Sequence, residues 1–269
     1  MRSTIVLFLL FGLITAELMA GDRKGHKAPY GHSPDQLVLS LKPEEIKSPS
    51  AEPVISPCIA EEAKPHVDNR IGGIDVSHHN GVIDWAKVAR DRRVTFCYIK
   101  ATESSSFIDS RYAYNIREAR RHGVKVGAYH FFSPTASPVV QMQNMFATVK
   151  LSEQDLIPIV DVEAVKRKTD LNAFRQRLKT FLNGVERHYG IRPLIYTGEN
   201  FYNNILAGHF TEYKFMIAKY REPEPRIDDR NTEVILWQFT STGSIDGIRG
   251  NCDQSIFLKD YNIKDILIK

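Results

Sequence analysis

Short apolar runs alternate with amphipathic stretches from residue 71 to the end of the chain, and this alternation constrains the fold more than any other feature. The pattern is typical of strands separated by helices, which pack as an α/β fold. The eight predicted strands are residues 71–76, 94–101, 125–132, 157–163, 194–197, 215–220, 235–239 and 252–257. Eight such strands predict a closed barrel.

Helices are predicted after the earlier strands, at residues 84–91, 110–122, 138–151 and 170–188. The last of these has apolar residues at helical spacing, and Gly123 is a stop signal for the second. The connections between the last three strands have much weaker helical patterns. We therefore predict an α/β fold, an irregular TIM-like barrel of eight strands with helices mainly after the first five.

The amino-terminal part of the chain differs from the rest in composition. Residues 1–20 are predicted to be a secretory signal peptide, because a basic start precedes an apolar run at residues 5–14 and then small residues. An uncleaved membrane anchor is the alternative. Residues 21–70, rich in Pro, Lys, Glu, His and Ser, are predicted to be a flexible linker or tether. The compact domain is predicted at residues 71–269, in a protein that is secreted, periplasmic or otherwise in the cell envelope.

Composition narrows the classes of partner. With 269 residues and a formal net charge of +4, the chain has a modest positive balance, so nucleic-acid binding is not predicted. The three cysteines, Cys58, Cys97 and Cys252, allow at most one internal disulfide. Cys97 lies in a strongly apolar run and is predicted to be a buried small hydrophobic residue.

Two acids end the fourth apolar run. Asp161 and Glu163 are two residues apart, and side chains at this spacing point to the same face of a strand. Like charges this close resist joint ionisation, so one carboxyl can stay protonated near neutral pH while the other is charged. Such a pair suits glycoside hydrolysis. The alternative is a solvated strand end whose carboxylates cap a helix or pair with Lys166 and Arg167.

Other polar side chains also end the predicted strands, and in barrels of this type the carboxyl ends of the strands carry the active site. The residues expected to converge with the acid pair are Asp75, Lys100, Glu103, Tyr129, His130, Tyr196, Tyr220, Trp237, Gln238 and Asp253. Carboxylates interleaved with aromatic rings predict a sugar cleft. For Tyr196 and Tyr220, packing in the core is the alternative role.

Several motifs together resemble those of glycoside hydrolase family 25. They are GIDVSHHNG at 73–81, YIKATE at 98–103, GAYHF at 127–131, PIVDVE at 158–163, LWQF at 236–239 and GNCD at 250–253. The resemblance covers the chain from about residue 71 to its end and follows the family's order. It implies an eight-stranded barrel with helices after the earlier strands.

The resemblance also implies an activity and residue roles. Family members are lysozymes, N-acetylmuramidases that cleave the β-1,4 bond between N-acetylmuramic acid and N-acetylglucosamine in peptidoglycan. By match to the motifs, Glu163 is expected to be the general acid and Asp161 its charged neighbour, with Asp75 and Asp253 completing the catalytic acids. The substrate-binding residues are expected to be Glu103, Tyr129, Tyr196, Tyr220, Trp237 and Lys100.

The mechanism that we expect is substrate assistance, in which the 2-acetamido oxygen of muramic acid attacks while Asp161 supports the acetamido nitrogen. A role for Asp253 as nucleophile or base is the alternative. We expect a monomer that binds peptidoglycan glycan strands without a cofactor. No metal is predicted, because the histidines at the strand ends have no third ligand at motif spacing. A non-catalytic peptidoglycan-binding protein and a chitinase-like glycosidase remain alternative functions.

Overall fold

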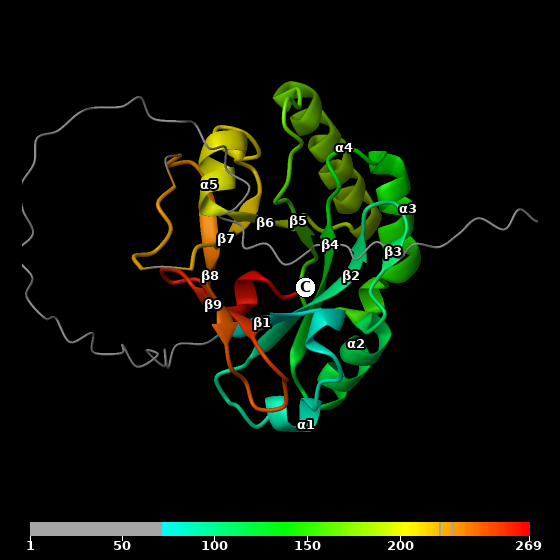
Figure 1. Cartoon of the computed structure of the whole chain (residues 1–269), viewed down its shortest axis with the longest axis vertical. Helices are drawn as coiled ribbons and strands as arrows, with labels where there is room; N and C mark the ends of the chain where they lie inside the picture. The colour runs from blue at the N-terminus through cyan, green and yellow to red at the C-terminus, as the bar shows by residue number, and fades with distance from the viewer. Residues whose placement is uncertain (1–71, 221, 228) are drawn as a thin grey trace, which may run out of the picture. The chain divides into compact units, whose positions relative to one another are not determined.

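The computed structural model describes residues 72–220, 222–227 and 229–269, and within them the chain forms a closed barrel. The predicted signal peptide and the whole of the predicted tether lie outside the described residues. The barrel strands are β1 (Gly73–Val76), β2 (Phe96–Glu103), β4 (Lys125–Phe131), β5 (Ile159–Asp161), β6 (Leu194–Gly198), β7 (Lys214–Ala218), β8 (Glu233–Gly243) and β9 (Cys252–Phe257). Pairing of β1 with both β2 and β9 closes the ring, and the two-residue β3 (Phe107–Ile108) pairs with β2 outside it. These eight strands confirm the predicted barrel (Figure 1).

One of the eight barrel strands runs in the opposite direction to the other seven. The pairs from β1 through β2, β4, β5, β6 and β7 to β8 are all parallel, whereas β9 runs antiparallel to both of its neighbours, β8 and β1. A short connection can join only antiparallel neighbours, because a parallel return needs a crossover of a dozen or more residues. The segment at 244–251 between β8 and β9 is too short for that crossover. The start of β9 therefore lies at the carboxyl-terminal edge of the other strands.

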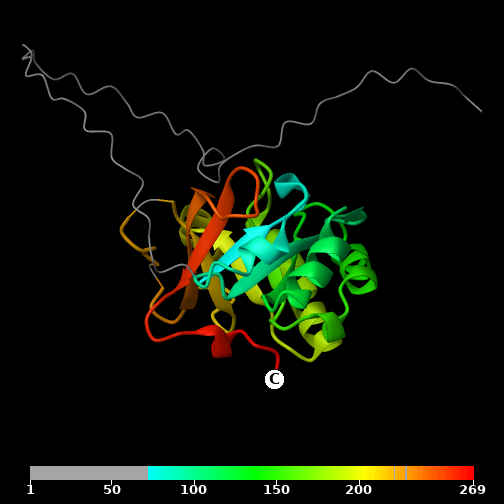
Figure 2. The same ribbon diagram turned by 90° about the horizontal axis from the view of Figure 1, so that it is seen from below.

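Helices follow the first five barrel strands, as predicted. They are α1 (Trp85–Val88), α2 (Tyr112–Arg121), α3 (Pro138–Thr148), α4 (Leu171–Tyr189) and α5 (Glu199–Phe201), the last continued by a π-helical turn at Tyr202–Leu206. Helix α4 begins where the Asp170 side chain accepts hydrogen bonds from two backbone N–H groups and ends at Gly190, whose φ of 68° is left-handed. Figure 2 shows α2, α3 and α4 on one side of the barrel and strands β8 and β9 on the other. No helix in the described part of the chain has the length and apolar character needed to cross a bilayer.

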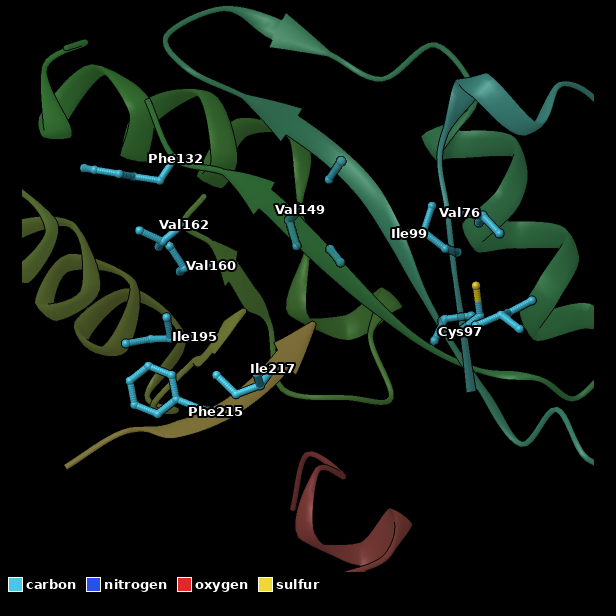
Figure 3. Close-up of a cluster of buried hydrophobic side chains, with 14 of the residues drawn as sticks. Val76, Cys97, Ile99, Phe132, Val149, Val160, Val162, Ile195, Phe215 and Ile217 are labelled. Atoms are coloured by element: carbon cyan, nitrogen blue, oxygen red, sulfur yellow. The ribbon is translucent and has the colours of Figure 1, made fainter. Parts of the chain in front are cut away.

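The outward side chains of the strands form the larger core. Ile99, Val160, Ile195 and Ile217 are fully buried with the inward faces of the helices (Figure 3). Burial of each such side chain contributes roughly 1.5–3 kcal/mol. Cys97 belongs to this cluster and is a free buried thiol, which confirms its predicted role as a small hydrophobic residue.

The inward side chains fill one half of the barrel with apolar groups. Phe96 and Tyr98 occupy the interior. Gly73 leaves room for the Phe96 ring and Gly127 for the Tyr98 ring, since a Cβ at Gly73 would overlap the first ring and a Cβ at Gly127 would lie 2.5 Å from the second. Near the carboxyl terminus of the chain, the backbone carbonyl of the buried Ile266 accepts a hydrogen bond from the Ile157 N–H. This contact covers the end of the barrel where the parallel strands begin. The polar inward side chains therefore gather at the other end of the barrel, where the parallel strands finish.

Candidate active site

The Asp161–Glu163 pair lies where β5 ends. Asp161 is the last residue of the strand, Val162 points outward into the main core, and Glu163 follows on the same side as Asp161. The two carboxyls are close enough that the charge of Glu163 is the second cause, after burial, of a raised Asp161 pKa. The outer face of β5 is apolar and covered by helices, so the apolar Val162 side chain points there. The two acids on either side of it in the sequence therefore point inward.

Burial and mutual repulsion hold protons on these acids. The pKa of Asp161 is raised well above its ordinary value by burial and by Glu163, and the ammonium of Lys100 opposes the shift. The pKa of Glu163 is raised to about 7, chiefly by burial, with Tyr196 and Lys100 lowering it and Asp253 raising it. The pair therefore keeps at least one proton near neutral pH, as a proton donor requires.

Asp75 and Asp253 complete a four-carboxyl cluster. They lie opposite each other in the β1–β9 register, on the inner face. Burial and the charge of Asp253 raise the pKa of Asp75 to about 7, while burial raises that of Asp253 to about 6. One correction to the sequence prediction concerns Asp253, which is the second residue of its strand and not its end. It joins the cluster because β9 is antiparallel.

A β-bulge brings Glu103 to the inner face. Lys100 and Glu103 are three residues apart, so strict alternation would put them on opposite faces of β2. The register with β4 shifts just after Lys100, which lies opposite Tyr129, so that Glu103 lies opposite Phe131. Lys100 Nζ then donates to Glu103 Oε2 over 2.6 Å. Both residues act electrostatically on Asp161. Asp161 is buried, whereas the other charged residues of the site are partly exposed, namely Asp75, Lys100, Glu103, Glu163 and Asp253.

Gln238 connects the predicted tyrosines to Asp75. Its Oε1 accepts hydrogen bonds from the Tyr196 hydroxyl at 2.8 Å and the Tyr220 hydroxyl at 3.0 Å, and its Nε2 donates to Asp75 Oδ2 at 3.1 Å. Ser255 Oγ donates to the same Asp75 oxygen at 3.4 Å. Sequence reasoning placed Gln238 at a strand end without giving it a site role. The signal that was available was the phase of β8, in which Leu236 and Gln238 share a face.

Trp237 lies apart from the cluster. Its neighbour Gln238 faces inward, so Trp237 faces outward, where it is 1% exposed and packs in the main core. Its Nε1 donates to the Lys219 carbonyl at 2.8 Å. The predicted substrate-binding role of Trp237 therefore needs correction, because a side chain buried on the outer face cannot contact a substrate on the inner one.

Two of the histidines near the strand ends, His78 and His130, have polar side-chain partners. His78 Nδ1 lies 2.7 Å from Asp109 Oδ2, in a 3-10 turn after β1. His130 is fully buried on the outer face of β4, with Nδ1 2.8 Å from the Thr102 hydroxyl. Burial lowers the pKa of His130 to about 4, so the ring is neutral. Within the described residues, no group of three or more His, Cys, Asp or Glu side chains is arranged to hold a metal ion.

A barrel that gathers four acids of raised pKa at one end has the features of a glycoside hydrolase. The sequence pattern of the family Glycosyl hydrolases family 25 matches residues 74–248. The chain therefore belongs to glycoside hydrolase family 25.

Individual relatives agree with this assignment. The uncharacterized protein YegX of Escherichia coli K12 is 38% identical over 191 residues, which are 70% of this chain and 69% of YegX. Lysozyme M1 of Streptomyces globisporus is 28% identical over 199 residues, 70% of this chain and 67% of that protein. The solved family 25 glycosyl hydrolase from Bacillus anthracis superimposes with a TM-score of 0.65 and 26% identity, covering 72% of this chain and 91% of the other. The protein is thus a glycoside hydrolase that groups with the lysozymes.

Proposed function

We propose that the protein hydrolyses the β-1,4 bond between N-acetylmuramic acid and N-acetylglucosamine in peptidoglycan, with Glu163 as the general acid. The observation that carries this proposal is the Asp161–Glu163 pair, two mutually repelling acids on the inner face at the barrel end. Family membership and the likeness to Lysozyme M1 support the substrate class. A substrate in the wall favours a secreted or envelope location.

Glu163 is suited to donate the proton. Its pKa of about 7 keeps a large fraction protonated near neutral pH, and its side chain retains partial exposure at the barrel end. The leaving sugar oxygen accepts this proton as the glycosidic C–O bond breaks. The resulting Glu163 carboxylate then takes a proton from the water that completes hydrolysis.

Asp161 is suited to orient the acetamido group. Its Oδ1 is buried and has no hydrogen-bond partner within the described part of the chain. An unpaired buried acceptor costs about 1–3 kcal/mol, so a donor from the substrate would be favourable here. The N–H of the 2-acetamido group supplies such a donor while its carbonyl oxygen attacks the anomeric carbon. Donation to Oδ1 favours the Asp161 carboxylate, and this leaves the shared proton on Glu163.

The remaining predicted residues have supporting roles in this proposal. Lys100 counters the negative charge of the acid pair, and Glu103 holds its ammonium. Tyr129 and Tyr220 are partly exposed inner-face aromatics available to a sugar ring, whereas Tyr196 is 9% exposed and acts through its hydroxyl. Asp253, with a pKa of about 6, is the alternative nucleophile or base.

Mass spectrometry of digested, purified peptidoglycan tests the bond that is cut. Fragments with a muramic acid reducing end support the proposal, and fragments with a glucosamine reducing end contradict it. Release of chitin oligomers without peptidoglycan fragments would indicate the chitinase-like alternative. Binding to peptidoglycan without any fragment would indicate a non-catalytic protein. The control is Glu233→Gln. Glu233 is exposed at the start of β8, at the end of the barrel away from the acids, so this substitution should leave the products unchanged.

A further inference from the structure

The hairpin of β2 and β3 places Phe107 beside the acid cluster. In the antiparallel register of the two strands, Phe107 lies opposite Glu103 and Ile108 lies opposite Thr102. Directly opposed side chains project from the same face of a sheet. Phe107 therefore shares the inner face with Glu103, whereas Ile108 shares the outer face with Thr102. The phenyl ring stands on the side of the sheet that carries the four acids.

Lys100 connects the Phe107 ring to the catalytic pair. Its Nζ lies 5.5 Å from the centroid of the Phe107 ring and 5.2 Å from that of the Phe131 ring, and it donates to Glu103 Oε2 over 2.6 Å. A cation this close to an aromatic ring is attracted to the face of the ring. Lys100 also acts electrostatically on Asp161. A ligand that covers Lys100 can therefore contact both the ring and the acids.

Polar side chains hold Phe107 in place. Asn144 on α3, which lies beside β3 (Figure 1), donates from Nδ2 to the backbone carbonyls of Ser104 at 3.2 Å and Phe107 at 3.0 Å. The buried Asp109, just after β3, accepts from the His78 N–H at 2.9 Å and lies 2.7 Å from His78 Nδ1. The His78 ring lies next to Phe107, with ring centroids 5.6 Å apart. A ring fixed in advance loses little freedom when a ligand binds.

Phe107 is open to solvent in spite of these contacts. It is 40% exposed, which makes it the most accessible Phe, Tyr or Trp in the described part of the chain. Isolated exposed apolar residues are common on protein surfaces, but this ring is fixed by polar contacts and lies beside a cluster of carboxyls. The C–H groups on one face of a pyranose ring are apolar and carry partial positive charge. They fit the negative face of an aromatic ring.

We propose that Phe107 forms a subsite for a pyranose ring of the glycan strand, next to the sugar that lies at the Asp161–Glu163 pair. The identity of this ligand rests on the proposed function. Stacking of a neighbouring sugar on Phe107 fixes the strand along the inner face and so positions the reacting bond. Because the contact is the same before and during the reaction, it lowers KM and leaves kcat unchanged.

Calorimetric titration of peptide-free glycan fragments, about six sugars long, into the full chain carrying Glu163→Gln tests the subsite. Adding Phe107→Ala should weaken binding about tenfold, because the stacked ring is lost. Phe107→Trp supplies another ring and should keep the affinity. Phe107→Leu is apolar but has no ring face, so its binding should be as weak as that of Phe107→Ala. Full affinity in Phe107→Leu would overturn the stacking contact.

Ile108→Ala is the matched control. Ile108 is the next residue on the same strand and is 55% exposed, but it projects from the outer face. The affinity should not change in this variant, and an equal loss in Ile108→Ala and Phe107→Ala would overturn the subsite. Thermal unfolding of every variant checks that it folds.

Fragments that keep their stem peptides distinguish a sugar subsite from a peptide subsite. Phe107→Ala should weaken the binding of these fragments by the same factor as that of the peptide-free ones. A loss confined to the fragments with peptides would show that Phe107 contacts the peptide, and would overturn the proposal.

Mass spectrometry of the recovered fragments separates the subsite from the proposed catalysis. Intact fragments together with the tenfold loss in Phe107→Ala support the subsite. If Glu163→Gln still cuts the fragments, the general-acid proposal fails, and the subsite is then tested by kinetics in the otherwise wild-type chain. Phe107→Ala should there raise KM about tenfold without a change in kcat. An unchanged KM would overturn the subsite.

Discussion

Replacing Asp75 with Asn should stabilise the folded barrel above pH 7 while impairing the site. Asn is close in size and keeps an oxygen that accepts from Gln238, so the change mainly removes a charge that burial and Asp253 oppose. A raised carboxyl pKa means that the folded state binds the proton more tightly than the unfolded state. The contribution of this proton to the free energy of unfolding of the wild type is fully present below pH 3.8 and is lost as pH rises through about 7.

The magnitude follows from the two pKa values of Asp75. The interval between 3.8 and about 7 corresponds to about 4 kcal/mol at roughly 1.4 kcal/mol per pH unit. Partial exposure of Asp75 to solvent reduces this, and we expect ~2 kcal/mol at pH 8. For a domain of this size that is a rise in Tm of roughly 4–8 °C.

Urea unfolding of wild type and Asp75→Asn at pH 4 and pH 8 measures this difference directly. The variant should gain stability over wild type between the two pH values, whereas Asp260→Asn, a change at an exposed aspartate, should show no such gain. A stability difference that is the same at both pH values would refute the argument that Asp75 is charged at a cost in the folded state.

Other changes have separate expected outcomes. Turnover of peptidoglycan should fall as pH rises through about 7, because Glu163 must be protonated and its pKa is about 7; a rate that keeps rising to pH 9 would contradict this. Asp161→Asn should lower turnover by roughly 100-fold or more, with less effect on KM, and normal kcat in stopped assays would exclude its orienting role. Gly127→Ala should cost about 1–3 kcal/mol in urea unfolding, because the new Cβ meets the Tyr98 ring at 2.5 Å, and an unchanged midpoint would show that the interior has room.

Much of the fold could be predicted because apolar runs report burial directly. The barrel strands and the helices after the first four of them match the predicted segments, with shifts at their ends, whereas the short α5 after β6 had no predicted segment. The pairing of strands was less accessible. That β9 is antiparallel follows from a short connection, and this direction is why Asp253 meets Asp75 from the start of a strand.

The site was harder to predict because side-chain direction depends on register. Trp237 and Gln238 are consecutive, so only one of them faces inward, and the apolar run around them contains no polar alternation to set the phase. Glu103 reaches the cluster through a bulge, which spacing alone does not reveal. Asp161 and Glu163 were predictable because their spacing of two keeps both on one face whichever phase the strand adopts.

The comparison of wild type with Glu163→Gln on purified peptidoglycan, with products identified by mass spectrometry, tests the central assignment. Gln keeps the shape of Glu163 but has no acidic proton, so turnover should fall by roughly 100-fold or more. Wild type should release fragments that end in reducing muramic acid. Near-normal turnover by the variant would show that the proton comes from another group.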